Sequence, residues 1–207
     1  MTTSYLKKRI KTIILKIRSN FYLWKLINTI LFKSDKTIYK KHCLKNLVTA
    51  TTVLNKLKIN YWLTDGTLLG FYRDGDFIKN DFDVDLAVFI DELNPSLIKE
   101  FKKQGMYLLR SSGKKECGLE YTFSRKGVNL DIFFFYKEKD YIWHAAWLYD
   151  EIIRFRYPYQ QYSINTYLGH QFRTPENIEE YVRTKYGEGW RKPVGKWDWA
   201  RDPKNIF

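Results

Sequence analysis

A run of alternating acidic and apolar residues places the strongest constraint on what this chain can fold into. Residues 81–90 read DFDVDLAVFI, and because successive side chains of a strand point to opposite faces, Asp81, Asp83 and Asp85 share one face. Three charged carboxylates on one face repel one another, and a bound cation relieves that repulsion. We therefore expect a divalent-metal site at the point where a buried strand begins.

Two other structures can carry such an acidic run. An EF-hand calcium loop also opens with D-x-D-x-D, and Glu92 falls at its twelfth position. Leu86, however, stands where that loop requires glycine, and residues 86–90 are apolar β-formers, so the calcium loop is excluded. A solvated acidic turn is the other alternative, and the direct continuation into an apolar strand argues against it.

The segment before the acidic run predicts a turn that binds phosphate. A short strand at Tyr61–Leu63 leads into GTLLG, where Gly66 lets the backbone approach a ligand closely. The N–H groups at such a helix start, together with the Thr67 hydroxyl, can hold a phosphate, and Arg73 can add a bidentate contact. A Gly-Thr turn is common by itself, so an ordinary strand–turn–helix with a surface arginine stays open as the alternative.

A single acid interrupts a later apolar strand. Residues 128–136 read VNLDIFFFY, and a charge such as that of Asp131 is costly in a buried strand unless it is paired or bound to a metal. A salt bridge to a nearby lysine is one explanation. We favour the other, in which Asp131 is the third carboxylate of the metal site, on a strand beside the one that carries Asp83 and Asp85. Mg²⁺ or Mn²⁺ suits such oxygen ligands.

The remaining patterns predict an α+β domain over residues 37–207, a β-sheet flanked by helices. Thr174 is the expected N-cap of the last helix. Helices are expected at 37–59, 95–104 and 175–185, and strands at 61–63, 81–90, 106–111, 119–125 and 128–136.

Most of the excess positive charge lies at the start of the chain. Residues 1–41 hold eleven Lys and Arg against the one acid Asp35, so 11 − 1 = +10 of the net +13 falls there and 13 − 10 = +3 remains. Apolar residues recur between these cations at helical spacing, which predicts a basic amphipathic arm over residues 1–36 that lies in a membrane surface. A helix packed on the domain with a solvated basic face is the alternative.

Several classes of protein do not fit this sequence. No uncharged apolar run approaches the ~20 residues of a membrane span. Nucleic acid is not an expected partner, because the arm has no recognisable motif and its aromatics lie on the apolar stripe. Cys43 and Cys117 match no metal-ligand spacing, which indicates free thiols in a reduced compartment. We expect a cytoplasmic protein, peripheral at a membrane surface.

The aromatic residues of the second half have two interpretations each. His144 lies between Trp143 and Trp147, where a hydrogen-bonded packing residue is more common than a catalyst. Residues 187–207 interleave tryptophans with basic residues. That tail is either a packed flap or a lid that offers stacking rings and cations to a nucleotide-type ligand.

The motifs GTLLGFYR and DFDVDLAVFI, in this order, resemble the LicD and fukutin group of phosphotransferases. The similarity covers roughly residues 45–206, and the tail YGEGWRKPVGKWDWARDPKNI is closer to the fukutin branch than to the bacterial phosphocholine branch. The resemblance implies a nucleotidyltransferase-like fold with a mixed β-sheet. Matched residue by residue, it implies Gly66 and Thr67 in the phosphate-side turn, Arg73 after it, and Asp83, Asp85 and Asp131 as the metal-binding and catalytic acids.

Two departures from the family pattern concern the ligand contacts. Lys79-Asn80 stands where many LicD proteins have Pro-Trp, which changes the loop before the acids. Asp65 stands where the family usually has a small residue, and it is either an additional acid of the site or a turn residue.

The resemblance also implies the reaction. A phospho-alcohol, either ribitol phosphate or a similar polyol phosphate or phosphocholine, moves from a CDP-activated donor to a hydroxyl of a glycan or glycolipid, with release of CMP, in the synthesis of cell-surface polysaccharide or glycoconjugate. A Golgi lumen is the alternative location if the source is eukaryotic. Nucleotidyl transfer from an NTP and a non-catalytic, membrane-associated glycan-binding role stay open as alternative functions.

Overall fold

The computed structural model of this chain describes residues 36–79, 81–148 and 151–207. The basic amphipathic arm that we expect over residues 1–36 therefore lies, apart from its last residue, outside the described part. No helix in the described part is both long enough and apolar enough to cross a membrane. Lys36–Phe207 form one compact unit.

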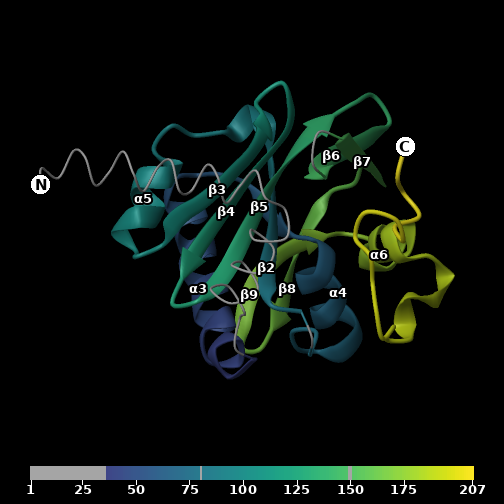
Figure 1. Cartoon of the computed structure of the whole chain (residues 1–207), viewed down its shortest axis with the longest axis horizontal. Coiled ribbons are helices and arrows are strands. Elements are labelled where there is room, and N and C mark those ends of the chain that lie inside the picture. Colours follow the sequence, from purple (N-terminus) through teal and green to yellow (C-terminus); the bar gives the residue numbers. More distant parts are fainter. Residues whose placement is uncertain (1–35, 80, 149–150) are drawn as a thin grey trace, which may run out of the picture. The chain divides into compact units, whose positions relative to one another are not determined.

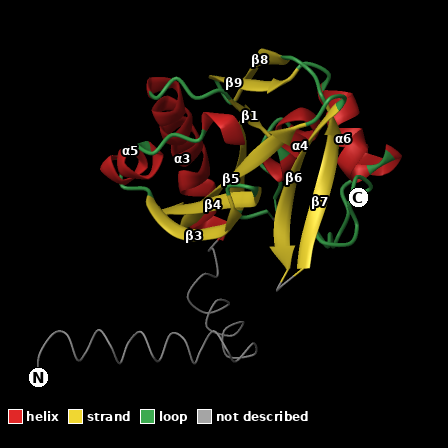
Figure 2. Ribbon diagram, turned by 90° about the horizontal axis from the view of Figure 1, so that it is seen from above, coloured by secondary structure: helices red, strands yellow, loops and turns green. Residues whose placement is uncertain are grey.

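A mixed β-sheet lies at the centre of this unit (Figures 1 and 2). Its first five strands run in the order β1-β2-β5-β4-β3, and β6 joins β5 to β7. β2 and β5 are parallel, whereas the other neighbours are antiparallel. The strands of this sheet in the described residues are β1 Tyr61–Leu63, β2 Asp83–Phe89, β3 Tyr107–Lys114, β4 Cys117–Arg125, β5 Val128–Lys137, β6 Tyr141–Leu148 and β7 Glu151–Pro158.

Helices cover this sheet, and a separate hairpin lies next to it. Figure 2 shows α3 and α5 on one side of the central strands and α4 and α6 on the other. The hairpin of β8 (Tyr162–Tyr167) and β9 (His170–Pro175) lies beside β1. The helices of the described chain are α3 Lys36–Lys56, α4 Asp65–Asp74, α5 Leu97–Lys103 and α6 Ile178–Tyr186, with short 3₁₀ turns at Ile90–Glu92 and Glu188–Arg191. The predicted α+β class is confirmed.

The pairing of β2 with β5 is the feature that positions the site. Both strands are apolar on both faces beyond their first residues, as expected for parallel strands buried between layers of helices. Asp85 pairs with Asp131 in the register of these strands. The expectation that Asp131 lies on a strand beside the one carrying Asp83 and Asp85 is therefore confirmed.

Three local expectations need correction. β2 begins at Asp83, so Asp81 lies in the preceding loop rather than in the strand. The last helix begins at Ile178 and its N-cap is Asn177, whose side chain accepts a hydrogen bond from the Glu180 N–H at 3.1 Å. Thr174 instead belongs to β9, because its hydroxyl accepts a hydrogen bond of 2.7 Å from Asn165 across the hairpin.

The tail is a packed flap at two of its tryptophans. Trp190 is buried and stacks on Tyr72, and Trp197 packs against Tyr186. The end of the chain is also held by backbone bonds, since the Arg156 N–H donates to the carbonyl of Asn205. Trp199 is 43% exposed, so of the three it alone is available for stacking on a ligand.

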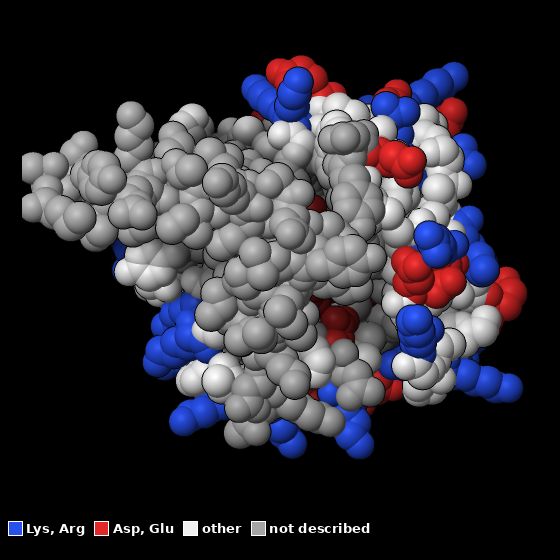
Figure 3. All heavy atoms as spheres, in the orientation of Figure 1, with Lys and Arg blue, Asp and Glu red and all other residues white. Residues whose placement is uncertain are grey.

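Charged side chains are unevenly distributed over the surface. Figure 3 shows Lys and Arg side chains along the lower left edge of one face and most of the exposed Asp and Glu side chains elsewhere. That edge corresponds in Figure 1 to the start of α3 and the turn between β4 and β5.

Candidate active site

The acidic cluster forms where α4 and β2 both begin. β1 pairs antiparallel with β2, and Leu63 lies opposite Leu86, so the chain enters α4 next to the start of β2. One carboxylate oxygen from each of Asp81, Asp83 and Asp85 lies within 4.8 Å of the others. Asp85 is buried and the other two are half-buried. The expectation that the three acids face the same side is thus confirmed.

These carboxylates are energetically unfavourable neighbours when all are charged. Burial raises the pKa of Asp85 well above its usual range, and the charges of Asp83 and Asp81 raise it further. Burial, followed by the charge of Asp83, likewise raises the pKa of Asp81 to about 8. Such a set of carboxylate oxygens provides ligands that suit a hard divalent cation.

Thr67 and Gly66 hold this cluster together. The backbone N–H of Thr67 donates to Asp85 Oδ2 at 3.2 Å, and its hydroxyl accepts from the Asp85 N–H at 2.8 Å. A Cβ on residue 66 would overlap with Asp81 Oδ2 and would lie 3.2 Å from Asp85 Oδ2, so any larger residue here would displace the Asp81 carboxylate. The observed contacts of both residues are with the acids, and their contact with a phosphate stays a prediction.

Asp131 faces the same side as Asp85 but stands slightly apart from the cluster. Its side chain is buried, and Asp131 Oδ1 has no hydrogen-bond partner among the described residues. Burial, followed by the charges of Asp83 and Glu120, raises the pKa of Asp131 to about 8. None of the ion pairs between described residues includes Asp131, so the salt bridge to a lysine is not observed. An unpartnered carboxylate oxygen beside three acids fits a cation site.

The structure does not bring Arg73 into the cluster. Thr67 lies in the first turn of α4 and Arg73 in its last, a separation of about 9 Å along the helix axis. The Arg73 guanidinium makes two hydrogen bonds, of 2.8 and 2.7 Å, with the Asp74 carboxylate, and a weaker one of 3.5 Å with the Trp190 carbonyl. Arg73 therefore ties α4 to the tail, and the phosphate cradle that we expected from Gly66, Thr67 and Arg73 together is not observed as one group.

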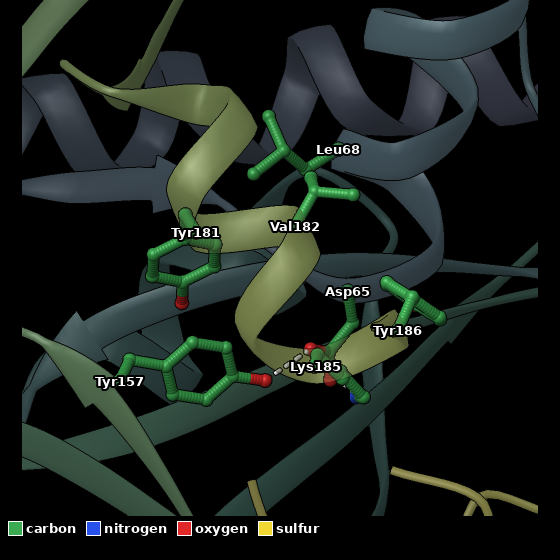
Figure 4. Close-up of a pocket in the computed structure, with 7 residues that line it drawn as sticks. All are labelled: Asp65, Leu68, Tyr157, Tyr181, Val182, Lys185 and Tyr186. Carbon is green, nitrogen blue, oxygen red and sulfur yellow. Dashed lines mark hydrogen bonds and ion pairs between the residues drawn. The ribbon is translucent and has the colours of Figure 1, made fainter. Parts of the chain in front are cut away.

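A second charged group also lies at the start of α4 (Figure 4). Lys185, from the end of α6, pairs with Asp65 at 2.7 Å, and the Tyr157 hydroxyl donates to the same carboxylate oxygen at 3.0 Å. Burial alone raises the pKa of Asp65, but the charge of Lys185 and these hydrogen bonds outweigh it and the pKa is lowered. Both side chains of the ion pair are buried, with exposed fractions of 8% for Lys185 and 9% for Asp65.

Asp65 is held in an unusual backbone conformation for this purpose. Its φ of 47° lies in the left-handed region, which is uncommon for residues other than glycine, although aspartate and asparagine adopt it more readily than most. Such a conformation persists only where surrounding contacts stabilise it. Asp65, left open between a site acid and a turn residue, is therefore the partner of Lys185.

His144 packs among aromatic rings. It is 1% exposed, its ring stacks on Phe155, and it also contacts Phe133 and Phe135. Burial lowers the pKa of His144 to about 3, so the imidazole is neutral at physiological pH. Neither ring nitrogen has a partner in the described residues. The packing interpretation is supported, although without the hydrogen bond that we expected.

A family model described as the nucleotidyltransferase domain of LicD/FKTN/FKRP proteins matches residues 58–177, which is more than half of the chain. This chain belongs to the LicD/FKTN/FKRP family. The resemblance inferred from the two motifs is confirmed.

Curated members of the LicD/FKTN/FKRP family match most of the chain. Ribitol-5-phosphate transferase FKTN from Macaca fascicularis is 35% identical over 182 residues, which are 84% of this chain and 40% of the relative. The Homo sapiens protein of the same name is 34% identical over the same length and the same shares. Ribitol 5-phosphate transferase FKRP from Mus musculus is 25% identical over 145 residues, 66% of this chain and 29% of the relative. The chain thus spans about 40% of the length of the FKTN relatives.

Among solved structures, the antibiotic-resistance factor ANT(2'')-Ia aligns with 76% of this chain and 77% of its own, with a TM-score of 0.48 and 12% sequence identity.

The LicD/FKTN/FKRP match itself includes Asp65, the acidic cluster and Asp131 but ends before Lys185. Lys185 is the residue that sequence reasoning missed. No local pattern marks it, because a lysine in the last turn of a helix is the ordinary response to the helix dipole.

Proposed function

We propose that this chain transfers a phospho-alcohol from a CDP-activated donor to a glycan hydroxyl in a metal-dependent reaction. The bond between the alcohol-bearing phosphorus and the leaving CMP breaks, and a bond from the acceptor oxygen to that phosphorus forms as the hydroxyl proton departs. Ribitol phosphate is the first candidate for the transferred group, because the FKTN relatives are named ribitol-5-phosphate transferases. The convergence of Asp81, Asp83 and Asp85 within 4.8 Å carries the proposal.

The acids of this site fit Mg²⁺ or Mn²⁺. Asp83 and Asp85 would hold the cation, with Asp131 as the third acid and Asp81 as a further member of the cluster. When bound, such a cation neutralises charge on phosphate oxygens of the donor. Thr67 keeps the Asp85 carboxylate in place through the two bonds described above. The unpartnered Oδ1 of Asp131 either completes the cation site or accepts the proton of the acceptor hydroxyl.

The phosphate side of the site belongs to the start of α4. We keep Gly66, Thr67 and Arg73 as donor contacts in the proposal, with Gly66 and Thr67 closest to the acids. The present bonds of Arg73 to Asp74 compete with such a contact, so Arg73 would exchange them when a donor binds. The acceptor is a glycan or glycolipid, and the location is a membrane surface reached from the cytoplasm or the Golgi lumen.

Donor binding gives the most direct test. We expect CDP-ribitol, CDP-glycerol or CDP-choline to raise the midpoint of thermal unfolding in the presence of Mg²⁺, since a ligand at 100 times its Kd stabilises the folded state by about 2.7 kcal/mol. Asp85→Asn should abolish the shift, whereas Asp140→Asn, at an exposed acid with no ion pair to a described residue, should keep it. CMP release from the donor that binds then establishes the reaction.

The alternatives predict different results in the same experiment. Nucleotidyl transfer from an NTP, which the name of the family domain keeps in view, predicts shifts with NTPs and none with CDP-alcohols. A non-catalytic glycan-binding role predicts no nucleotide-dependent shift and an unchanged cellular activity of Asp83→Ala and Asp85→Ala variants. Either pattern would overturn the proposal.

A further inference from the structure

One face of α3 carries exposed cations around an exposed isoleucine. Ile38, Lys41, His42 and Lys45 follow the spacing i, i+3, i+4 and i+7, which places them on the same side of the helix. Ile38 is 39% exposed, and both lysines are exposed. The sequence from residue 36 to 60 contains no Asp or Glu, so α3 has no acid of its own to balance these charges.

The turn between β4 and β5 extends this charged face. Arg125 and Val128 pair across the hairpin, which leaves Lys126 and Gly127 as a two-residue loop with φ angles of 51° and 76°. Loops of this kind strongly favour Asn-Gly or Asp-Gly, because the first residue must also adopt a positive φ. Lys126 is therefore a less favourable residue for this turn than asparagine or aspartate, and it adds an exposed cation there.

Contacts fix the turn against α3. The side chain of Asn46 donates to the Arg125 carbonyl at 2.9 Å, and the Arg125 guanidinium donates to Asn46 Oδ1 at 3.2 Å. The side chain of Ile38 lies 3.2 Å from the position that a Cβ on Gly127 would occupy. The helix face and the turn are therefore one surface, which we call the α3–turn surface and which consists of Ile38, Lys41, His42, Lys45, Arg125 and Lys126.

The charges of the α3–turn surface act on one another rather than on acids. Partial burial, followed by the charges of Lys126 and Lys41, lowers the pKa of His42. None of Lys41, Lys45 and Lys126 forms an ion pair with an acid in the part of the chain that the structure describes. Positive potential without an internal partner is the signature of a surface that meets an external anion.

We propose that the α3–turn surface docks on an anionic membrane. Headgroup phosphates and carboxylates complement the cations, and Ile38 is an apolar group at the centre that can enter the interface. The sequence before α3 adds charge of the same sign, because residues 1–35 contain eight Lys and Arg and one Asp, 8 − 1 = +7. A nucleic acid fits less well, since the α3–turn surface has no exposed Phe, Tyr or Trp on which bases stack.

Docking in this way brings the acidic cluster to the membrane. Tyr39, next to Ile38, donates from its hydroxyl to the backbone carbonyl of Asp83 at 2.9 Å. Asn129, two residues after Gly127, pairs with Asp83 in the sheet. The α3–turn surface and the acidic cluster thus lie at the same ends of α3 and β5, and an acceptor anchored in lipid would be presented beside the acids.

Binding of the full chain to vesicles tests the proposal. The variant Lys41→Gln/Lys45→Gln/Lys126→Asn removes three cations while it keeps helix-forming residues in α3 and puts the preferred residue in the turn. We expect about 100-fold weaker binding to phosphatidylcholine vesicles that contain phosphatidylserine, because each basic residue near an anionic leaflet contributes about 1 kcal/mol. The matched control Lys115→Gln/Lys139→Gln/Lys192→Gln removes the same charge from other exposed positions and should bind within a few-fold of the unmodified chain.

Other outcomes decide against the proposal. If thermal unfolding shows that both chains are folded, equal vesicle binding of the triple variant and the unmodified chain would show that the α3–turn surface does not bind the membrane. The same loss of vesicle binding in the control variant would show a general effect of net charge. Tighter binding to duplex DNA than to vesicles at equal salt would show that the partner of the surface is a nucleic acid and not a membrane. The outcome of the vesicle experiment is independent of the proposed function, because the triple variant should bind CDP-alcohols as the unmodified chain does. If neither chain binds a CDP-alcohol, that failure counts against the transferase proposal and not against membrane docking.

Discussion

At the scale of single residues, Gly66 shows how tightly the acidic cluster is built. A side chain fits at this position only if the Asp81 carboxylate moves, because that carboxylate occupies the space and Asp85 lies within 3.2 Å. Sequence reasoning selected Gly66 for a close approach, but the group that approaches is an acid of the same chain rather than a ligand. A sequence therefore indicates more readily that a glycine makes a close contact than which group lies on the other side of that contact.

Substitution of Gly66 tests this role. We expect Gly66→Ala to displace Asp81 and to weaken Mn²⁺ binding by about tenfold or more, while alanine in the first turn of α4 leaves the helix intact or favours it by up to about 1 kcal/mol. Mn²⁺ binding followed by electron paramagnetic resonance measures the effect. Gly189→Ala is the control, because nothing lies within 4 Å of a Cβ there. Unchanged Mn²⁺ affinity in Gly66→Ala would contradict a cation site that includes Asp81.

At the scale of elements, the Asp65–Lys185 pair joins α6 to α4 beside the acids. The two residues are 9% and 8% exposed at the side chain, so both charges depend on each other for compensation. The charge of Lys185 also opposes the effects of burial and of Asp83, which raise the pKa of Asp81. The C-terminal helix is in this way an electrostatic part of the site.

Removal of one partner should be more harmful than removal of both. We expect Lys185→Met to lower the free energy of unfolding by about 3–5 kcal/mol, because it leaves the Asp65 charge buried without a partner. Asp65→Asn/Lys185→Met should recover a large part of that loss. Urea denaturation measures both, with Lys192→Met as an exposed control. A loss below about 1 kcal/mol for Lys185→Met would show that Asp65 is not charged in the folded protein.

Elements also show where local signals compete. Thr174-Pro175 has the form of a helix start, but the same threonine serves the β8–β9 hairpin, and Asn177 caps α6 instead. The strands from 141 to 175 were not predicted, because their apolar and polar residues do not alternate cleanly. Their burial depends on packing against α6, β1 and the tail, which no local pattern reports.

At the scale of the whole molecule, the acids make stability depend on pH and on metal. Burial is the main cause that raises the pKa of Asp81 and of Asp131 to about 8, so from about pH 4 to 8 the folded state binds more protons there than the unfolded state. These acids therefore make the metal-free protein less stable as the pH rises through that window. Burial of neutral His144, whose pKa is lowered to about 3, acts in the opposite direction below about pH 6.5.

The clearest measurement lies between pH 6.5 and 8. Without divalent cations, we expect the free energy of unfolding in urea to fall over this range, by at most about 1.4 kcal/mol per pH unit for each acid. Saturating Mg²⁺ should remove or reverse the slope, because a bound cation favours the charged carboxylates. Asp81→Asn should flatten the metal-free slope. A metal-free stability that rises from pH 6.5 to 8 would contradict the raised pKa values.

The sequence by itself determined the α+β class and the family, and it indicated the acids of the candidate site. Alternation along a strand and an acid within an apolar run can both be recognised from neighbouring residues, and burial makes either pattern costly without a structural reason. Only the tertiary structure decided which groups meet. The parallel register of β2 and β5 brings Asp131 to Asp85, the contacts of α6 give Asp65 its lysine, and the length of α4 separates Arg73 from the cluster. The physical reason is that these contacts join residues far apart in the chain, and their energies depend on distance and burial, which exist only after the layers have packed.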